Sequence, residues 1–139
     1  MNRWVAGIAV GLLFLSPTMV LAEGCRLEDG ITVPAVESMN QMLLDLDVQG
    51  FTAAIQDELG GDVTEQMSQL AEMYKDGFYG CTTIAQRVDR GGMVQNLVFF
   101  NGKTAPMFVY WMAAEDGGRY VLLAFKFSTV LDDVMVALR

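Results

Sequence analysis

The hydrophobic pattern of the chain changes once, near residue 77. Before that residue, apolar side chains recur every three or four positions, as they do on one face of an α-helix. This spacing predicts helices from Pro34 to Gly50, over Phe51–Leu59, and from Asp62 to Gly77. Proline suits the first turn of a helix and glycine suits the position after the last turn, so these residues also mark the expected boundaries.

After residue 77 the chain consists of short runs of aromatic and β-branched residues, separated by residues that favour turns. The runs predict four strands: Tyr79–Val88, Met93–Phe100, Ala105–Ala114 and Arg119–Phe127. Short connections such as Asn101-Gly102 favour an antiparallel sheet. Residues 129–138 predict a short terminal helix or a tail packed on the sheet. Helices followed by strands predict an α+β fold with the N-terminal helices on one face of the sheet.

The N-terminal segment has the pattern of a secretory signal peptide. Arg3 precedes an apolar run from Trp4 to Leu15, and Val20-Leu21-Ala22 offers small residues before a cleavage site. The apolar run is shorter than the roughly twenty residues that a membrane-spanning helix needs. We therefore expect cleavage after Ala22, a single domain over residues 23–139, and export to a bacterial periplasm with no further membrane contact.

Cys25 and Cys81 are the only cysteines of the chain. Export places both in an oxidising compartment, so we expect them to form a disulfide. A redox or metal-binding pair is disfavoured because the two residues lie far apart and form no C-x-x-C motif.

The charge of the chain excludes several classes of partner. The net charge is −8, and no basic patch is present, which excludes nucleic acid and anionic lipid surfaces. Residues 23–76 carry most of the acids. We interpret this acidity as a contribution to solubility, and attraction of a cationic partner is the alternative.

The absence of histidine excludes several kinds of chemistry. Ser-His-Asp and Cys-His catalysis need this residue, and so do the usual zinc sites. The sequence also lacks the glycine-rich motifs that bind nucleotides. We therefore predict no catalytic residue, no metal site and no cofactor.

The order of elements resembles that of the NTF2-like (cystatin-like) superfamily, whose members are cone-shaped α+β domains. Residues 46–54 are similar to the family segment that joins its first two helices, and residues 110–129 look like its last hairpin. The resemblance covers roughly residues 33–130. It implies a curved antiparallel sheet of about four strands, a cone that can enclose a cavity, and dimers formed through the outer face of the sheet.

Both faces of the predicted sheet are largely apolar, whereas the helices cover only one of them. A second apolar face in a soluble protein implies burial against something else. We therefore expect a homodimer, or another protein partner, at the outer face.

The first hypothesis for function is a non-catalytic domain that binds a small apolar ligand inside the cone. The candidate ligand-binding residues are Met39, Leu43, Met67, Leu70, Tyr74, Leu97, Phe99, Trp111 and Phe125. The alternation of residues along the strands assigns the last four to the covered face. Two alternatives stay open: an interaction or scaffold module that acts as a homodimer without a ligand, and a cofactor-free acid–base enzyme of the isomerase or dehydratase type that uses a buried Asp.

Overall fold

The computed structural model describes residue 25 and residues 27–138 of the chain. The expected signal peptide, residues 1–22, and its cleavage site lie outside these residues. The described elements are the helices α1 (Pro34–Leu44), α2 (Val48–Leu59) and α3 (Thr64–Met73), the strands β1 (Phe78–Asp89), β2 (Met93–Gly102), β3 (Met107–Asp116) and β4 (Arg119–Ser128), the short helix α4 (Leu131–Met135), and the 3-10 turns η1 (Arg90–Gly92) and η2 (Val136–Leu138). None of the helices in this part of the chain is long and apolar enough to cross a membrane.

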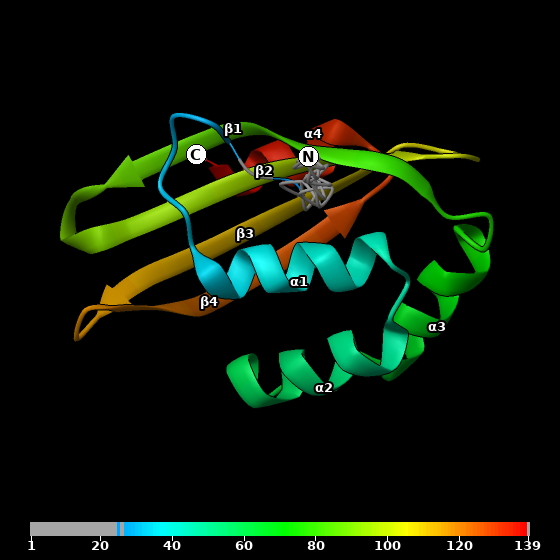
Figure 1. Ribbon diagram of the computed structural model, residues 1–139, viewed down its shortest axis with the longest axis horizontal. Helices are drawn as coiled ribbons and strands as arrows, with labels where there is room; N and C mark the ends of the chain where they lie inside the picture. The colour runs from blue at the N-terminus through cyan, green and yellow to red at the C-terminus, as the bar shows by residue number, and fades with distance from the viewer. Residues whose placement is uncertain (1–24, 26, 139) are drawn as a thin grey trace, which may run out of the picture.

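The strands of the described part form an antiparallel sheet in the order β1-β2-β3-β4. Figure 1 shows α1, α2 and α3 on one face of the curved sheet and α4 on the other. We call the face under α1, α2 and α3 the inner face, and the opposite one the outer face. The predicted α+β fold, with N-terminal helices packed on one face of an antiparallel sheet, is confirmed.

The inner face carries the main hydrophobic core. Trp111 of β3 lies near its centre and contacts Phe51 of α2 and Phe125 of β4, with ring centroids 6.1 and 5.4 Å apart. Large aromatic side chains bury much apolar area, so this cluster joins the sheet to the helices. The core around it contains Val36, Met39, Leu43, Ile55, Met67, Leu70, Val94, Val98, Phe100, Val109 and Leu122.

The first two helices meet at a different place from the one predicted. α1 ends at Leu44, and the Asp47 carboxylate accepts a hydrogen bond from the Gly50 N–H at 3.0 Å, which caps α2. A Cβ at Gly50 would collide with that carboxylate. The prediction that Gly50 ends a helix is therefore wrong, because this glycine lies inside α2 and makes room for the cap. Leu46 completes the junction in the left-handed region, with φ of 53°.

The C-terminal segment, residues 131–138, packs on the outer face. Val134 is fully buried there against Leu97 of β2 and Tyr110 of β3. The Arg87 guanidinium of β1 donates a hydrogen bond to the Leu138 carbonyl at 3.0 Å. The segment is thus both a short helix and a tail packed on the sheet, and it covers part of the face at which we expected a partner.

The predicted disulfide between Cys25 and Cys81 is present, with the two Cα atoms 4.8 Å apart. Cys81 lies on β1, an edge strand of the sheet. The N–H of Thr83, also on β1, donates to the Cys25 carbonyl at 2.9 Å, and the Thr83 hydroxyl donates to the same oxygen. The disulfide and these bonds fix the start of the described chain to the edge of the sheet.

The chain before α1 then follows the same edge; we call residue 25 and residues 27–33 the N-terminal strap. The Gln86 side chain of β1 accepts a hydrogen bond from the Ile31 N–H and donates one to the Ile31 carbonyl, each at 2.8 Å. An edge strand otherwise presents backbone groups that can pair with another chain. The strap therefore protects the β1 edge.

Replacement of both Cys25 and Cys81 by alanine should lower the free energy of unfolding by about 4 kcal/mol. The reason is that the disulfide closes a long loop, over a separation of 56 residues, and so restricts the unfolded chain. Urea unfolding of residues 23–139, followed by Trp111 fluorescence, measures the difference. Wild-type protein with its disulfide reduced is the control and should resemble the variant. A loss below about 1 kcal/mol would contradict the expectation.

Candidate functional site

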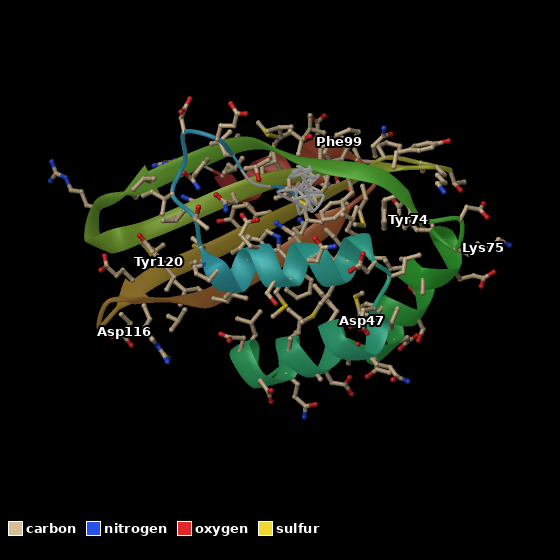
Figure 2. The ribbon with its side chains drawn as sticks, viewed as in Figure 1. Asp47, Tyr74, Lys75, Phe99, Asp116 and Tyr120 are labelled. Carbon is tan, nitrogen blue, oxygen red and sulfur yellow. A yellow bond between two sulfur atoms is a disulfide. The ribbon has the colours of Figure 1, made fainter. Side chains whose placement is uncertain are left out.

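A pocket of about 230 Å³ opens between α3 and the end of the sheet where β3 begins and β4 ends. In Figure 2, Tyr74 marks this place, between the C-terminal end of α3 and the sheet. The pocket is lined by Gln66, Gln69, Leu70, Met73 and Tyr74 from the α3 side, and by Met107, Phe127, Ser128 and Thr129 from the sheet side.

The floor of the pocket is apolar and its mouth is polar. Leu70, Tyr74 and Met107 are buried and form the floor. Met73, with 52% of its surface exposed, and the half-buried Phe127 form the walls. The exposed polar residues of the lining are Gln66, Gln69 and Thr129, and Ser128 is half-buried. A ligand in this pocket therefore contacts apolar surface at the floor and hydrogen-bonding groups at the opening.

Tyr74 presents its ring to the pocket, while its hydroxyl is already engaged. The hydroxyl donates to the Pro106 carbonyl at 2.8 Å, and the ring stacks on Phe78 with centroids 5.0 Å apart. Burial raises the pKa of Tyr74 above its ordinary value of 10.0. The side chain consequently contributes apolar surface to the pocket and stays neutral at physiological pH.

Ser128 joins the pocket to the C-terminal segment. Its hydroxyl accepts a hydrogen bond from the Val130 N–H at 3.0 Å and donates one to the Asp133 carboxylate at 2.8 Å. Both bonds join Ser128 to residues at the start of α4, so this hydroxyl stabilises the N-terminal end of that helix.

The predicted ligand-binding residues do not line a common cavity. Leu70 and Tyr74 line the pocket described above. Leu97 and Phe99 lie on the outer face, so the prediction that they share a face with Trp111 is wrong. The physical reason is the strand register, which pairs Asn96 with Trp111 and Leu97 with Tyr110. The inner core takes up the others, which are Met39, Leu43, Met67, Trp111 and Phe125.

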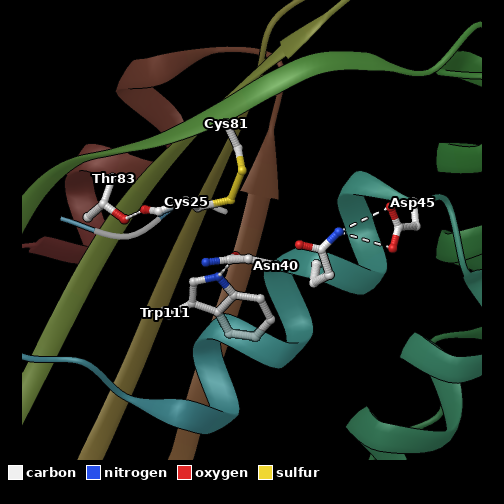
Figure 3. The surroundings of a disulfide bond; sticks show 7 residues. Cys25, Asn40, Asp45, Cys81, Thr83 and Trp111 are labelled. Carbon is white, nitrogen blue, oxygen red and sulfur yellow. Dashed lines mark hydrogen bonds between the residues drawn. A yellow bond between two sulfur atoms is a disulfide. The ribbon is translucent and has the colours of Figure 1, made fainter. Parts of the chain in front are cut away.

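The centre of the predicted cone is occupied by the aromatic cluster around Trp111. The Trp111 indole N–H donates to the Asn40 side-chain oxygen of α1 at 2.8 Å, as Figure 3 shows. Both residues are almost completely buried. The space that the ligand was expected to fill is thus taken, at this position, by the protein's own side chains, and the pocket lies at the α3 end instead.

Sequence reasoning missed most of the residues that line the pocket: Gln66, Gln69, Met73, Met107, Phe127, Ser128 and Thr129. The helical part of the signal was present, because residues 66, 69, 70 and 73 share one side of a helix at spacings of three and four. The strand residues gave no such signal, since their position opposite α3 depends on where each strand begins and ends in the fold.

The acid–base alternative finds no buried Asp in the described part of the chain. Asp62 shows the opposite of what a general base needs, because hydrogen bonds from the Thr64 hydroxyl and N–H hold the pKa of its carboxyl below the ordinary value. Among the described residues, no group of three His, Cys, Asp or Glu side chains is placed to hold a metal ion.

Comparison of the chain with protein-family models, curated proteins and solved structures finds no match. The α+β architecture is shown by α1, α2 and α3 on one face of the antiparallel sheet. The resemblance to NTF2-like domains stays a prediction, based on element order and on the two segments quoted above.

The Tyr74→Phe variant should be less stable by about 1 kcal/mol at pH 7, because the Pro106 carbonyl loses its donor. The wild type should also lose more stability than the variant as the pH rises above 10. A raised folded-state pKa contributes stability below the ordinary pKa of 10.0, and this contribution is lost as the pH rises through the folded value.

Urea unfolding at pH 7 and at pH 11 tests both statements. Burial raises the pKa of Tyr110 as well, but both proteins retain that residue, so its effect cancels. Tyr79→Phe, at a position 73% exposed, is the matched control and should behave like the wild type. Equal alkaline losses in the wild type and Tyr74→Phe would contradict the role given to Tyr74.

Proposed function

We propose that this protein is an exported, NTF2-like binding domain that holds a small apolar ligand in the pocket between α3 and the sheet. The observation that carries the proposal is the pocket itself, with about 230 Å³ of space over a floor of buried apolar side chains. An apolar cavity of roughly 150 Å³ suffices to bind benzene, so the pocket has room for a ligand of one or two rings or a short alkyl chain.

Export is supported by two independent features. The sequence of residues 1–22 has the pattern of a cleavable signal peptide. The disulfide between Cys25 and Cys81 suits an oxidising compartment. Because Cys25 follows the expected cleavage site by three positions, the mature chain would begin almost directly with the N-terminal strap.

The NTF2-like assignment is supported by the order of the elements and by their layers. In this fold the helices precede a strand meander and pack on its inner face, as they do here. The outer face was expected to bind a partner. Since residues 131–138 cover part of this face, around Leu97 and Tyr110, the structure adds no support for a homodimer through it, and the proposal rests on the ligand.

The intact mass of the protein tests export. When the full chain is expressed in a bacterium with a periplasm, the periplasmic fraction should contain a protein that begins at Glu23. Its mass should be two hydrogens below that of the reduced chain because of the disulfide. Native mass spectrometry of the same sample also reports any ligand that copurifies. A protein that keeps residues 1–22, or that stays reduced in the cytoplasm, would contradict the export proposal.

Binding of the fluorescent apolar probe N-phenyl-1-naphthylamine tests the pocket. Met73→Lys should weaken probe binding at least about tenfold, because a charge on the pocket wall must be desolvated when the probe enters. The residue is 52% exposed and lies in the last turn of α3, where a positive charge suits the helix dipole, so the fold should tolerate the change.

Met135→Lys is the matched control, because Met135 is 43% exposed and lies on α4, outside the pocket lining. This variant should bind the probe like the wild type. The reverse result, with binding lost in Met135→Lys and kept in Met73→Lys, would place the probe on the C-terminal segment. That result, or an absence of binding to the wild type, would overturn the proposed function.

A further inference from the structure

The hydrogen-bonding groups at the mouth of the pocket are all uncharged. Gln66, Gln69 and Thr129 are the exposed polar residues there, and no charged side chain belongs to the described lining. Charged side chains lie elsewhere on and beside α3, where the acids Glu65 and Glu72 and the cation Lys75 are exposed. The neutral mouth is therefore a local property of the pocket.

These mouth groups have hydrogen-bonding capacity to spare. The hydroxyls of Tyr74 and Ser128 are engaged within the protein. The side chains of Gln66, Gln69 and Thr129 make no hydrogen bond to another described residue. A glutamine amide both donates and accepts, and a threonine hydroxyl does the same. The mouth can thus satisfy a ligand group of either kind.

A charged head group would find no counter-charge in this lining. An anion would in addition approach a chain of net charge −8, and Asp133 is bonded to Ser128 beside the pocket. A cation would find no carboxylate among the lining residues, because the nearby Asp133 lies outside the lining and already accepts a hydrogen bond from Ser128. Because a charge that leaves water without a partner is costly, both kinds of head group are disfavoured against a neutral one.

We infer that the pocket selects an uncharged amphiphile. The apolar body of the ligand rests on Leu70, Tyr74 and Met107, while a hydroxyl, amide or ester group at its other end bonds to the neutral side chains of the mouth. This inference rests on the proposed function, since it requires the pocket to bind a ligand, and it names the chemical class of that ligand.

Three ligands with the same eight-carbon chain test the inference: octan-1-ol, octanoate and octylammonium. Each displaces N-phenyl-1-naphthylamine from residues 23–139 at pH 7 in 0.15 M salt, a condition in which distant surface charges are largely screened. Octan-1-ol should displace the probe at a concentration about three to ten times lower than either charged ligand. In Gln69→Leu this advantage should shrink about threefold or more, measured as the ratio of the displacing concentrations so that any change in probe affinity cancels.

A gain-of-function variant distinguishes a direct contact with the ligand at the mouth from a general effect of ligand hydrophobicity. Gln69→Lys should shift the preference toward octanoate by at least about threefold relative to octan-1-ol, because the new cation lies at the mouth. Each ligand is titrated directly by calorimetry here, since a lysine in the lining also weakens binding of the probe. Gln56→Lys on α2 makes the same change of net charge at an exposed glutamine outside this pocket. That control should leave the order of the three ligands as in the wild type.

The possible results distinguish the inference from the proposed function. Equal displacement by the three ligands, or a Gln69→Lys variant that keeps the wild-type order, would overturn the inference while probe binding upholds the proposed function. A shift toward octanoate in Gln56→Lys as large as that in Gln69→Lys would also overturn it, because the selectivity would then come from net charge. If the probe fails to bind the wild type, both fail together.

Discussion

The hydrogen bond between Trp111 and Asn40 is the contact on which the arrangement of the two layers depends. The indole lies fully buried on β3, where its N–H requires an acceptor, and the Asn40 oxygen on α1 supplies one at 2.8 Å. The oxygen of the Asn40 amide thus has a partner, whereas the nitrogen of the same amide is buried without one among the described residues. Phe51 and Phe125 close around the same ring, so one side chain sets the positions of α1, α2 and β4. Because this cluster fills the centre, the pocket lined by Leu70, Tyr74 and Met107 lies beside it, at the α3 end.

The change of hydrophobic period near residue 77 was enough to predict the class of fold and the order of the elements, and the expected export of a chain with two cysteines predicted the disulfide. The face of each strand residue was harder to predict. Alternation assigned Leu123 to the same face as Phe125, but a bulge between β3 and β4 breaks the alternation there, and Leu122 is the buried residue instead. The β2–β3 register had the same effect on Leu97. Period-two patterns define which residues of one strand share a face, and only register and bulges relate that face to the next strand.

The candidate site was predictable on its helical side and hidden on its sheet side. Leu70 and Tyr74 belong to an apolar stripe that the sequence displays, and both line the pocket. Phe127 and Met107 come from opposite ends of two strands, and they meet only because β3 and β4 are antiparallel neighbours. The neutral mouth was also hidden in the sequence. It is defined by the absence of charge among residues that are neighbours in space, and the order of residues along the chain does not show which of them are neighbours.

The disulfide also determines how the molecule would respond to mechanical force. The bond between Cys25 and Cys81 makes a covalent ring that contains α1, α2 and α3, whereas most of the sheet lies outside it. Tension applied between Cys25 and Leu138 passes through the two sulfur atoms and bypasses the ring. Stretching can then extend only the chain after Cys81, by about 200 Å at most. The helical layer is shielded from the load, and only cleavage of the sulfur–sulfur bond would release its contour length.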